Sequence, residues 1–539
     1  MIRSFNTTST PWTTTPFVQW IATTETAAWI TQPAPTVTIN TSASTCADYT
    51  LSTTGGTAQT LEGFGACFNE LGSDAISALN STARAALLAE FWHPTEGMGL
   101  VYNRVPVGGN DYSDGWYSYD MLNRDEMDSG KLDLELTRFS VARDETKLLP
   151  YILAAQKLMD LEPANTQHLF ASAWSPPMWM KQNKNFSGCS TGTCSKVTTA
   201  TSCPGCCNSG SPTIPGGPPS PPNNLIQTAE AQTAYAKYLS RFVTEYKHRG
   251  VAVTAMMVQN EPYAGGCNYP KCEWTGEMLR RFIRDFMGPT FKQEHSVTNI
   301  KNGSCEVWLG TLNTEDFLEC PNTVLSDIEA KKFIKGAALQ WAGKGMIERV
   351  SQTWPDLPLI QSENECGDGT NAYSYAMTIF DLMRHYIGNG VRGYTYWNPI
   401  LGGVKGQHNG SSHWGWTQNS MVTVAEDGSG FVKNHEFYVF SHFARFFKPG
   451  AMRLEVAGDW SGTAIAARNP PAADGGSIAV VVMNPHLAAR RFTFETAASA
   501  AAAAAAAGGV AEEEGEVGKI FTFTVQLAPQ SFNSFLVQV

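Results

Sequence analysis

The sequence Val253-Thr-Ala-Met-Met-Val-Gln-Asn-Glu-Pro262 is an apolar run that ends abruptly in an amide, a carboxylate and a proline. A short apolar run bounded in this way is typical of a buried strand in a parallel sheet. A second run that ends in a carboxylate, Leu357-Pro-Leu-Ile-Gln-Ser-Glu363, lies farther along the chain. Each run predicts a strand that carries a glutamate into a site at its C-terminal end.

Eight runs of this kind alternate with segments whose apolar residues have the three- and four-residue spacing of a helix. The predicted strands are residues 61–68, 101–107, 168–174, 253–260, 306–312, 337–341, 357–363 and 391–397. The clearest predicted helices between them are 229–247 and 277–286. This alternation predicts an α/β fold with a parallel sheet, and eight strands are the number that closes a (β/α)8 TIM barrel.

The domain organisation follows from changes in pattern on either side of this barrel, which we place at residues 61–440. Residues 1–60 are rich in Thr, Pro and Ser, and predict an extended arm or edge strands that join a β domain. Residues 441–539 predict an appended all-β sandwich, because alternating runs replace the helical spacing. The predicted sandwich strands are 452–456, 477–483, 491–494, 521–525 and 534–538.

Two segments depart from these patterns. Residues 185–224 form a connection that is too long for an ordinary loop and hold five closely spaced cysteines, from Cys189 to Cys207. We predict a disulfide-stapled lid over one rim of the site. A zinc site is the alternative, but Cys203-Pro-Gly-Cys206 lacks a second well-spaced pair, so no metal is predicted. Residues 497–509 are nearly pure Ala and predict a variable hairpin loop.

Composition limits the partners and the compartment. The 539 residues carry a net charge of −11 without a clustered basic face, which argues against a nucleic-acid partner. No apolar run approaches the ~20 residues that span a bilayer, so no transmembrane segment is predicted. The first residues, Met1-Ile-Arg-Ser-Phe-Asn-Thr-Thr8, show no apolar core of a signal peptide.

The cysteines and the glycosylation sequons nevertheless indicate an oxidising compartment. The chain has twelve cysteines. The sequons begin at Asn6, Asn40, Asn80, Asn185, Asn302 and Asn409. We therefore expect a secreted protein or one that resides in a lysosomal or vacuolar lumen.

Two carboxyl groups at the mouth of a barrel predict glycosidase chemistry. Retaining cleavage of a glycosidic bond needs one protonated carboxyl to donate to the leaving oxygen and one ionised carboxyl to attack the anomeric carbon, roughly 5 to 5.5 Å away. Glu261 and Glu363 meet the sequence requirement, because the C-terminal ends of barrel strands converge. Asn260 can hydrogen-bond a sugar hydroxyl, and Pro262 fixes the turn that leaves the strand.

Longer motifs accompany this pair in a fixed order. They are Leu61-Glu-Gly-Phe-Gly-Ala-Cys-Phe-Asn-Glu70, Asn103-Arg-Val-Pro-Val107, Ala171-Ser-Ala-Trp-Ser-Pro-Pro-Met-Trp-Met-Lys181, Asn260-Glu-Pro262 and Gly393-Tyr-Thr-Tyr-Trp-Asn398. With them the chain resembles the glucosylceramidase-like members of glycoside hydrolase family 30, relatives of lysosomal acid β-glucosidase, from about residue 60 to its end. The resemblance implies a barrel fused to a β-sandwich and retaining hydrolysis of a β-glucoside without a cofactor.

The resemblance also implies roles for the matching positions. Glu261 would be the acid/base and Glu363 the nucleophile. Arg104 would keep the nucleophile ionised through its fixed positive charge. The implied substrate-binding residues are Glu70, Arg104, Trp174, Asn260 and Trp397.

Three features leave alternatives open. Glu365 competes with Glu363, because alternation along a strand would aim both side chains the same way; we prefer Glu363, which ends the apolar run. The sixth strand reads Leu339-Gln-Trp-Ala342 and lacks the family tyrosine that hydrogen-bonds the nucleophile, so the tuning there must differ. His408 and His413 either line the aglycone side or belong to an ordinary polar loop.

The same resemblance implies a glucosylceramidase that releases glucose and ceramide, and peripheral contact with a lipid membrane through that substrate. An endo-β-1,6-glucanase, or another polysaccharide hydrolase, is the alternative within the family. An inactive carbohydrate-binding protein on the same scaffold is the alternative from a different class.

Overall fold

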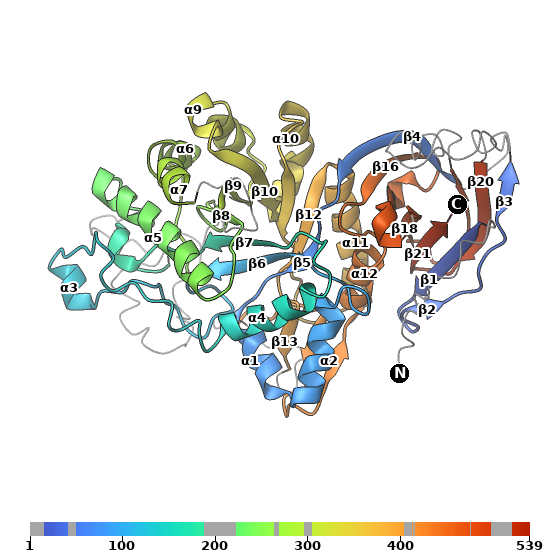
Figure 1. Ribbon diagram of the computed structural model, residues 1–539, viewed down its shortest axis with the longest axis horizontal. Coiled ribbons are helices and arrows are strands. Elements are labelled where there is room, and N and C mark those ends of the chain that lie inside the picture. Colours follow the sequence, from blue (N-terminus) through green and yellow to red (C-terminus); the bar gives the residue numbers. More distant parts are fainter. Residues whose placement is uncertain are drawn as a thin grey trace, which may run out of the picture.

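The computed structural model describes residues 16–40, 50–187, 222–263, 269–295, 304–403, 412, 415–474, 476–496 and 520–538. They form an α/β barrel and a separate all-β domain, side by side along the longest axis of the molecule (Figure 1). The predicted fold class is therefore confirmed, whereas the boundaries at residues 60 and 440 stay a prediction. The cysteine-rich run 189–207, the Ala tract, His408 and His413 lie outside the described residues.

Eight parallel strands form the barrel, and each overlaps one predicted run. They are β5 (Gly63–Ala66), β6 (Tyr102–Val107), β7 (His168–Ala173), β8 (Ala255–Met257), β9 (Glu306–Leu312), β10 (Ile334–Gln340), β11 (Leu359–Glu363) and β12 (Val391–Tyr396). Neighbours in sequence are neighbours in the sheet, and β12 pairs with β5. Between β5 and β6, Cys67 bridges to Arg104, and the Phe68 N–H donates to the Arg104 carbonyl at 2.9 Å.

The interior of the barrel is filled by apolar side chains. Side chains from strands on different sides of the ring can meet only inside it, so a cluster drawn from β6 to β11 marks the packed interior. Its members are Tyr102, Phe170, Ala255, Met257, Trp308, Ala338 and Ile360. Polar side chains gather instead at the C-terminal ends of the strands, where the candidate site lies.

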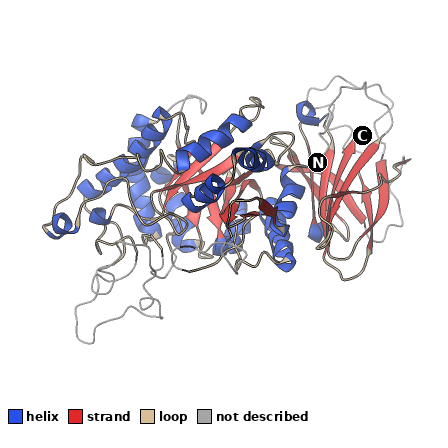
Figure 2. Ribbon diagram, turned by 90° about the horizontal axis from the view of Figure 1, so that it is seen from below, coloured by secondary structure: helices blue, strands red, loops and turns tan. Residues whose placement is uncertain are grey.

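Helices surround the barrel, as the view from below shows (Figure 2). The longest, α5 (Ala229–His248), forms as predicted, because Tyr235, Leu239, Phe242 and other buried residues share one face. Thr228 caps its start by accepting a hydrogen bond from the backbone. The other helices are α1 (Glu70–Ala78), α2 (Ser81–Trp92), α3 (Arg124–Asp128), α4 (Leu148–Met159), α6 (Gly276–Phe282), α7 (Gly288–Glu294), α8 (Thr323–Leu325), α9 (Ile328–Lys331), α10 (Ile347–Thr353), α11 (Tyr373–Gly388) and α12 (His435–Ala444).

Within the described residues, the β domain contains ten strands drawn from both ends of the chain. They are hydrogen-bonded in the order β2-β1-β21-β18-β17-β16-β4-β19-β20-β3. Phe492 of β19 stacks on Phe535 of β21 with ring centroids 5.4 Å apart, although these strands are far apart in the order. The sheet therefore curls over its own apolar core, and the two layers of the predicted sandwich result.

Each predicted sandwich run overlaps one of these strands. The N-terminal strands are β1 (Phe17–Thr23), β2 (Ile30–Thr31), β3 (Thr38–Asn40) and β4 (Thr50–Thr60). The C-terminal strands are β16 (Met452–Ala457), β17 (Ala464–Arg468), β18 (Ile478–Asn484), β19 (Arg490–Glu495), β20 (Ile520–Leu527) and β21 (Ser531–Gln538). A three-stranded sheet of β13 (Ile400–Gly402), β14 (Val422–Val424) and β15 (Phe431–Lys433) packs beside α1, and the short α13 (Pro471–Asp474) lies between β17 and β18.

Two predicted elements have different bounds in the structure. β8 ends at Met257, earlier than predicted, and Glu261 in the segment that follows has a left-handed φ of +49°. The predicted helix 277–286 is part of a longer helical segment, in which a π-helical turn (Ile283–Met287) joins α6 to α7.

Candidate active site

Arg104, on β6, is fully buried at the centre of the strand ends. Its Nη1 donates to Glu363 Oε2 at 2.5 Å, and its Nη2 donates to Asn260 Oδ1 at 2.6 Å. The guanidinium also donates to Ser172 Oγ at 2.8 Å and to a backbone carbonyl of β11 at 3.2 Å. One cation therefore joins β6, β7 and β11 to the turn that follows β8.

Glu363 is the last residue of β11, and its side chain is only 7% exposed. Arg104 binds its Oε2, and the Trp341 Nε1–H donates to its Oε1 at 2.8 Å. Both oxygens thus have donors, and the ion pair balances the buried charge.

Glu261 follows Asn260 and keeps part of its surface open to solvent. Its Oε2 accepts a hydrogen bond from the Tyr269 hydroxyl at 3.1 Å, and its Oε1 accepts one from Gln340 Nε2 at 3.2 Å. Burial, followed by the negative charge of Glu363, raises the pKa of Glu261 to about 7. Such a carboxyl holds its proton in mild acid, as a general acid must.

Asn260 offers one end of its amide to the site. Its Oδ1 accepts hydrogen bonds from Arg104, from Thr311 Oγ1 at 3.1 Å and from Gln340 Nε2 at 3.2 Å. Because the carbonyl end is engaged by three donors, the NH2 group is the part that can donate to a bound hydroxyl.

Trp174 and Trp397 follow β7 and β12 and stack with ring centroids 5.2 Å apart. The Arg104 guanidinium lies 4.6 Å from the Trp174 ring centroid and 5.6 Å from that of Trp397. Both rings are buried in a cluster with Tyr112 and Cys366. The cation is thus held between carboxylate and aromatic faces.

Asp111, which the sequence analysis did not select, is also under the electrostatic influence of Glu363 and Glu261. It lies in the loop after β6 and is 8% exposed. Burial, followed by the charge of Glu363, raises its pKa well above the ordinary range, and Glu261 adds to this effect. Its position shortly after a strand end was the one available signal.

Glu70 and Glu365 have partners of their own. Both oxygens of the buried Glu70 accept from Arg143, at 2.7 and 2.9 Å. Lys344 Nζ contacts Glu365 Oε1 at 2.5 Å. Glu365 also lies two residues beyond the end of β11, so the strand alternation that made it a rival of Glu363 does not extend to it. Sugar binding by Glu70 stays a prediction.

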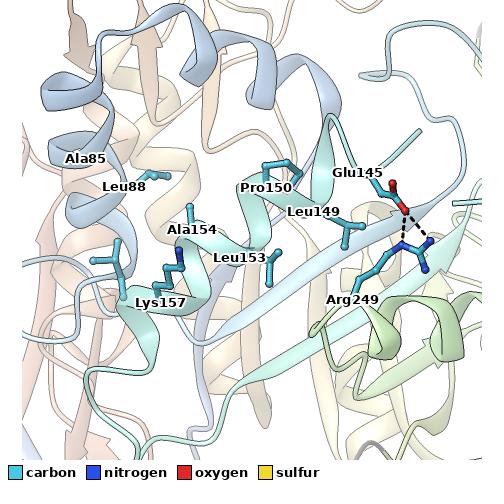
Figure 3. A pocket seen from close by; sticks show the side chains of 10 residues that line it. Ala85, Leu88, Glu145, Leu149, Pro150, Leu153, Ala154, Lys157 and Arg249 are labelled. Carbon is cyan, nitrogen blue, oxygen red and sulfur yellow. Dashed lines mark hydrogen bonds and ion pairs between the residues drawn. The ribbon is translucent and has the colours of Figure 1, made fainter. Parts of the chain in front are cut away.

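A second concave feature lies in the helical layer, between α2 and α4 (Figure 3). Its walls are mainly apolar, and the Glu145–Arg249 ion pair, at 2.7 Å, lies at one end. It is lined by Ala85, Leu88, Glu145, Leu149, Pro150, Leu153, Ala154, Lys157, Leu158 and Arg249. These residues include no predicted site residue.

Three further findings concern metal ligands, membrane-spanning helices and thiols in the described residues. Within the described ranges, no group of three or more His, Cys, Asp or Glu side chains is arranged to hold a metal ion. Of the helices that the structure describes, none is long and apolar enough to cross a membrane. The described cysteines that lack a disulfide are all buried, namely Cys67, Cys272, Cys305, Cys320 and Cys366.

The comparison with known families identifies the chain. Residues 61–198 and 226–447, more than half of the sequence, match the glycosyl hydrolase family 30 TIM-barrel domain. The chain belongs to glycoside hydrolase family 30. As the motifs predicted, this family 30 protein is a β-glycoside hydrolase on a TIM barrel.

Relatives of this family 30 chain carry two different activities in their names. It is 27% identical to the lysosomal acid glucosylceramidase of Mus musculus over 459 residues, which cover 79% of this chain and 75% of that protein. It is 24% identical to the endo-1,6-beta-D-glucanase of Neurospora crassa over 438 residues, 80% of each. The crystal structure of SrfJ from Salmonella typhimurium shares the fold, with a TM-score of 0.73 and 20% identity over 96% of this chain and 99% of that one.

Proposed function

We propose that this family 30 enzyme hydrolyses a β-glucoside with retention, with Glu261 as the acid/base and Glu363 as the nucleophile. The observation that carries the proposal is the contrast between the two glutamates of one site. Glu363 faces the Arg104 cation, whereas Glu261 faces neutral donors and has a raised pKa. One carboxyl is thereby suited to remain ionised and the other to remain protonated.

The reaction then proceeds in two displacements. Glu363 attacks the anomeric carbon while Glu261 gives its proton to the departing glycosidic oxygen, which leaves a glycosyl ester on Glu363. Glu261, now ionised, takes a proton from water, and this water attacks the same carbon and releases Glu363. Because part of Glu261 stays open to solvent, water can reach it for the second step.

The preferred nucleophile can be tested against its rival by covalent trapping. A 2-deoxy-2-fluoro-β-glucosyl fluoride should label Glu363, since the fluorine slows hydrolysis of the ester. The Glu365→Gln variant should still be labelled, because Glu365 pairs with Lys344, which is 41% exposed, and not with the Arg104 that binds Glu363. Peptide mapping that finds the label on Glu365 would reject the assignment, and NMR of the first-formed sugar anomer tests retention.

For the substrate, we propose a glucosylceramide-type glycolipid, which the name of the mouse relative supports. The alternative is a β-1,6-linked glucan, which the similarly distant Neurospora relative supports. Peripheral contact with a lipid membrane, and residence in a lysosomal or vacuolar lumen or outside the cell, belong to the glycolipid proposal. The raised pKa of Glu261 suits an acidic compartment, because it keeps the acid protonated there.

A substrate panel separates these alternatives. The enzyme should release glucose from glucosylceramide in detergent-dispersed vesicles at mildly acidic pH, and only slowly from a soluble β-1,6-glucan. Faster cleavage of the glucan, with oligosaccharide products, would instead establish the polysaccharide activity. An activated aryl β-glucoside is the control, because it reports active enzyme in either case.

A further inference from the structure

Trp341 makes a contact with Glu363 that neither sequence nor family predicted. It starts the 3₁₀ turn Trp341–Met346 directly after β10, and its indole Nε1–H donates to Glu363 Oε1 at 2.8 Å. Arg104 holds the other oxygen of the same carboxylate. An indole N–H donates and cannot accept, so this contact favours a carboxylate oxygen that carries no proton.

The backbone of Trp341 shows that this orientation is imposed. Its φ of +47° lies in the left-handed region, which bulky residues rarely adopt. Such conformations persist where the surroundings fix them, and they gather at functional sites. The same turn lies tightly against β9, since a Cβ added at Gly343 would come within 2.5 Å of the Leu312 carbonyl oxygen.

The turn also separates the two neighbouring glutamates. Trp341 binds Glu363, while Lys344, three residues later, binds Glu365. A single turn thereby directs one carboxylate into the Arg104 network and holds the other in a different ion pair. The centroid of the Trp341 ring lies 6.1 Å from that of the Trp416 ring, so the indole also has an aromatic neighbour.

We infer that Trp341 is a positioning residue, whose N–H fixes the Glu363 carboxylate in the orientation for attack on the anomeric carbon. The inference rests on the proposed role of Glu363 as nucleophile. When one carboxylate oxygen bonds to carbon and the leaving oxygen departs with the proton of Glu261, the other oxygen becomes the ester carbonyl. A carbonyl still accepts a hydrogen bond, so Trp341 can hold the group through both displacements.

Trp341→Phe tests this inference, because it keeps a ring and removes the donor. Trp354→Phe is the matched control. Trp354 directly follows α10 in the helical layer and stacks on Phe317, so its replacement changes no contact of Glu363. We expect the rate of Glu363 labelling by the fluorinated glucoside to fall about 10- to 100-fold in Trp341→Phe, as for a lost hydrogen bond to a charged group. The inhibition constant of an unreactive neutral glucoside should stay within about threefold, because binding alone does not use the nucleophile.

The outcomes separate this inference from the proposed function. Labelling of Glu363 at the wild-type rate in Trp341→Phe overturns the inference and leaves the nucleophile in place. Labelling of Glu365 in the wild-type enzyme overturns both. If Trp341→Phe does not fold, benzothienylalanine at position 341 replaces the N–H by sulfur in a ring of the same shape, and the same fall in labelling rate is expected.

Discussion

Replacement of Arg104 by methionine should remove most activity and destabilise the enzyme. The guanidinium is fully buried, and its partner Glu363 is 7% exposed. With charge centres roughly 4 Å apart and an effective dielectric constant of about 20, their attraction is about 4 kcal/mol. Removal of one member of a buried ion pair typically costs about 3–5 kcal/mol. We expect the free energy of unfolding to fall by about 3 kcal/mol at pH 7.

The kcat/KM of Arg104→Met should fall by more than its loss of stability alone would cause. Without Arg104, the carboxylate of Glu363 loses its charged partner, and Asn260 loses the donor of its shortest hydrogen bond. A loss of about 3–4 kcal/mol in the transition state lowers kcat/KM about 100- to 1,000-fold. Arg104→Lys is the informative companion, because lysine keeps the charge but cannot donate to Glu363, Asn260 and Ser172 together. It should recover more stability than activity.

The assays are urea unfolding at pH 7, and kcat/KM on an activated aryl β-glucoside. Activity of Arg104→Met within tenfold of the wild type would refute the reasoning, because the cation would then not control the nucleophile. A stability loss below about 1 kcal/mol at pH 7 would show that Glu363 is not the buried charge that Arg104 balances.

Three further predictions concern the carboxyl groups of Glu261, Asp111 and Glu70. The kcat/KM of the enzyme should fall as pH rises through about 7, where Glu261 loses its proton. Glu363→Gln should lower the pKa of Glu261, which NMR of labelled glutamate can follow. An unchanged pKa of Glu261 would contradict the coupling between the two carboxyl groups. Asp111→Asn should melt at a higher temperature than the wild type at pH 8 but not at pH 4. The reason is that an acid whose pKa is raised in the folded state destabilises the fold only at pH values above its unfolded pKa. Equal changes in melting temperature at pH 8 and pH 4 would contradict this prediction. Arg143→Met should lower the unfolding free energy by about 1–3 kcal/mol, since the buried Glu70 loses its cationic partner and keeps only the Asp114 N–H as a donor. Glu70→Gln in the same chain should restore part of this loss, and no rescue would mean that the ion pair is not its cause.

The barrel could be predicted from the sequence because buried parallel strands read as apolar runs. The same signal explains the error at β8, which was predicted to reach Asn260 but ends at Met257. Apolar residues report burial, and Val258 remains buried after strand pairing has ended. The π-helical turn Ile283–Met287 escaped prediction because one extra residue in a helical turn hardly alters the apolar spacing.

The candidate site residues were predicted either from apolar runs or from longer motifs. Asn260 and Glu363 were selected because each closes or follows an apolar run, and Arg104 came with its motif. Trp341 reaches Glu363 through a φ of +47°, which no local pattern encodes. Asp111 owes its raised pKa to burial and to Glu363, far away in sequence. Features that depend on how distant segments meet therefore had to come from the structure.

The proposed opposite roles of Glu261 and Glu363 require different surroundings for two chemically identical side chains, and the buried Arg104 provides that difference. One Arg104 Nη binds the Glu363 carboxylate, and the other binds the neutral amide of Asn260, next to Glu261. The charge of Glu363 then raises the pKa of Glu261, which favours the protonated state that a general acid needs. The amide of Asn260 occupies the second Nη, and we infer that this keeps the donor from the neighbouring Glu261. Replacing Asn260 by alanine should free that donor, lower the pKa of Glu261 and move the basic limb of the kcat/KM profile to lower pH.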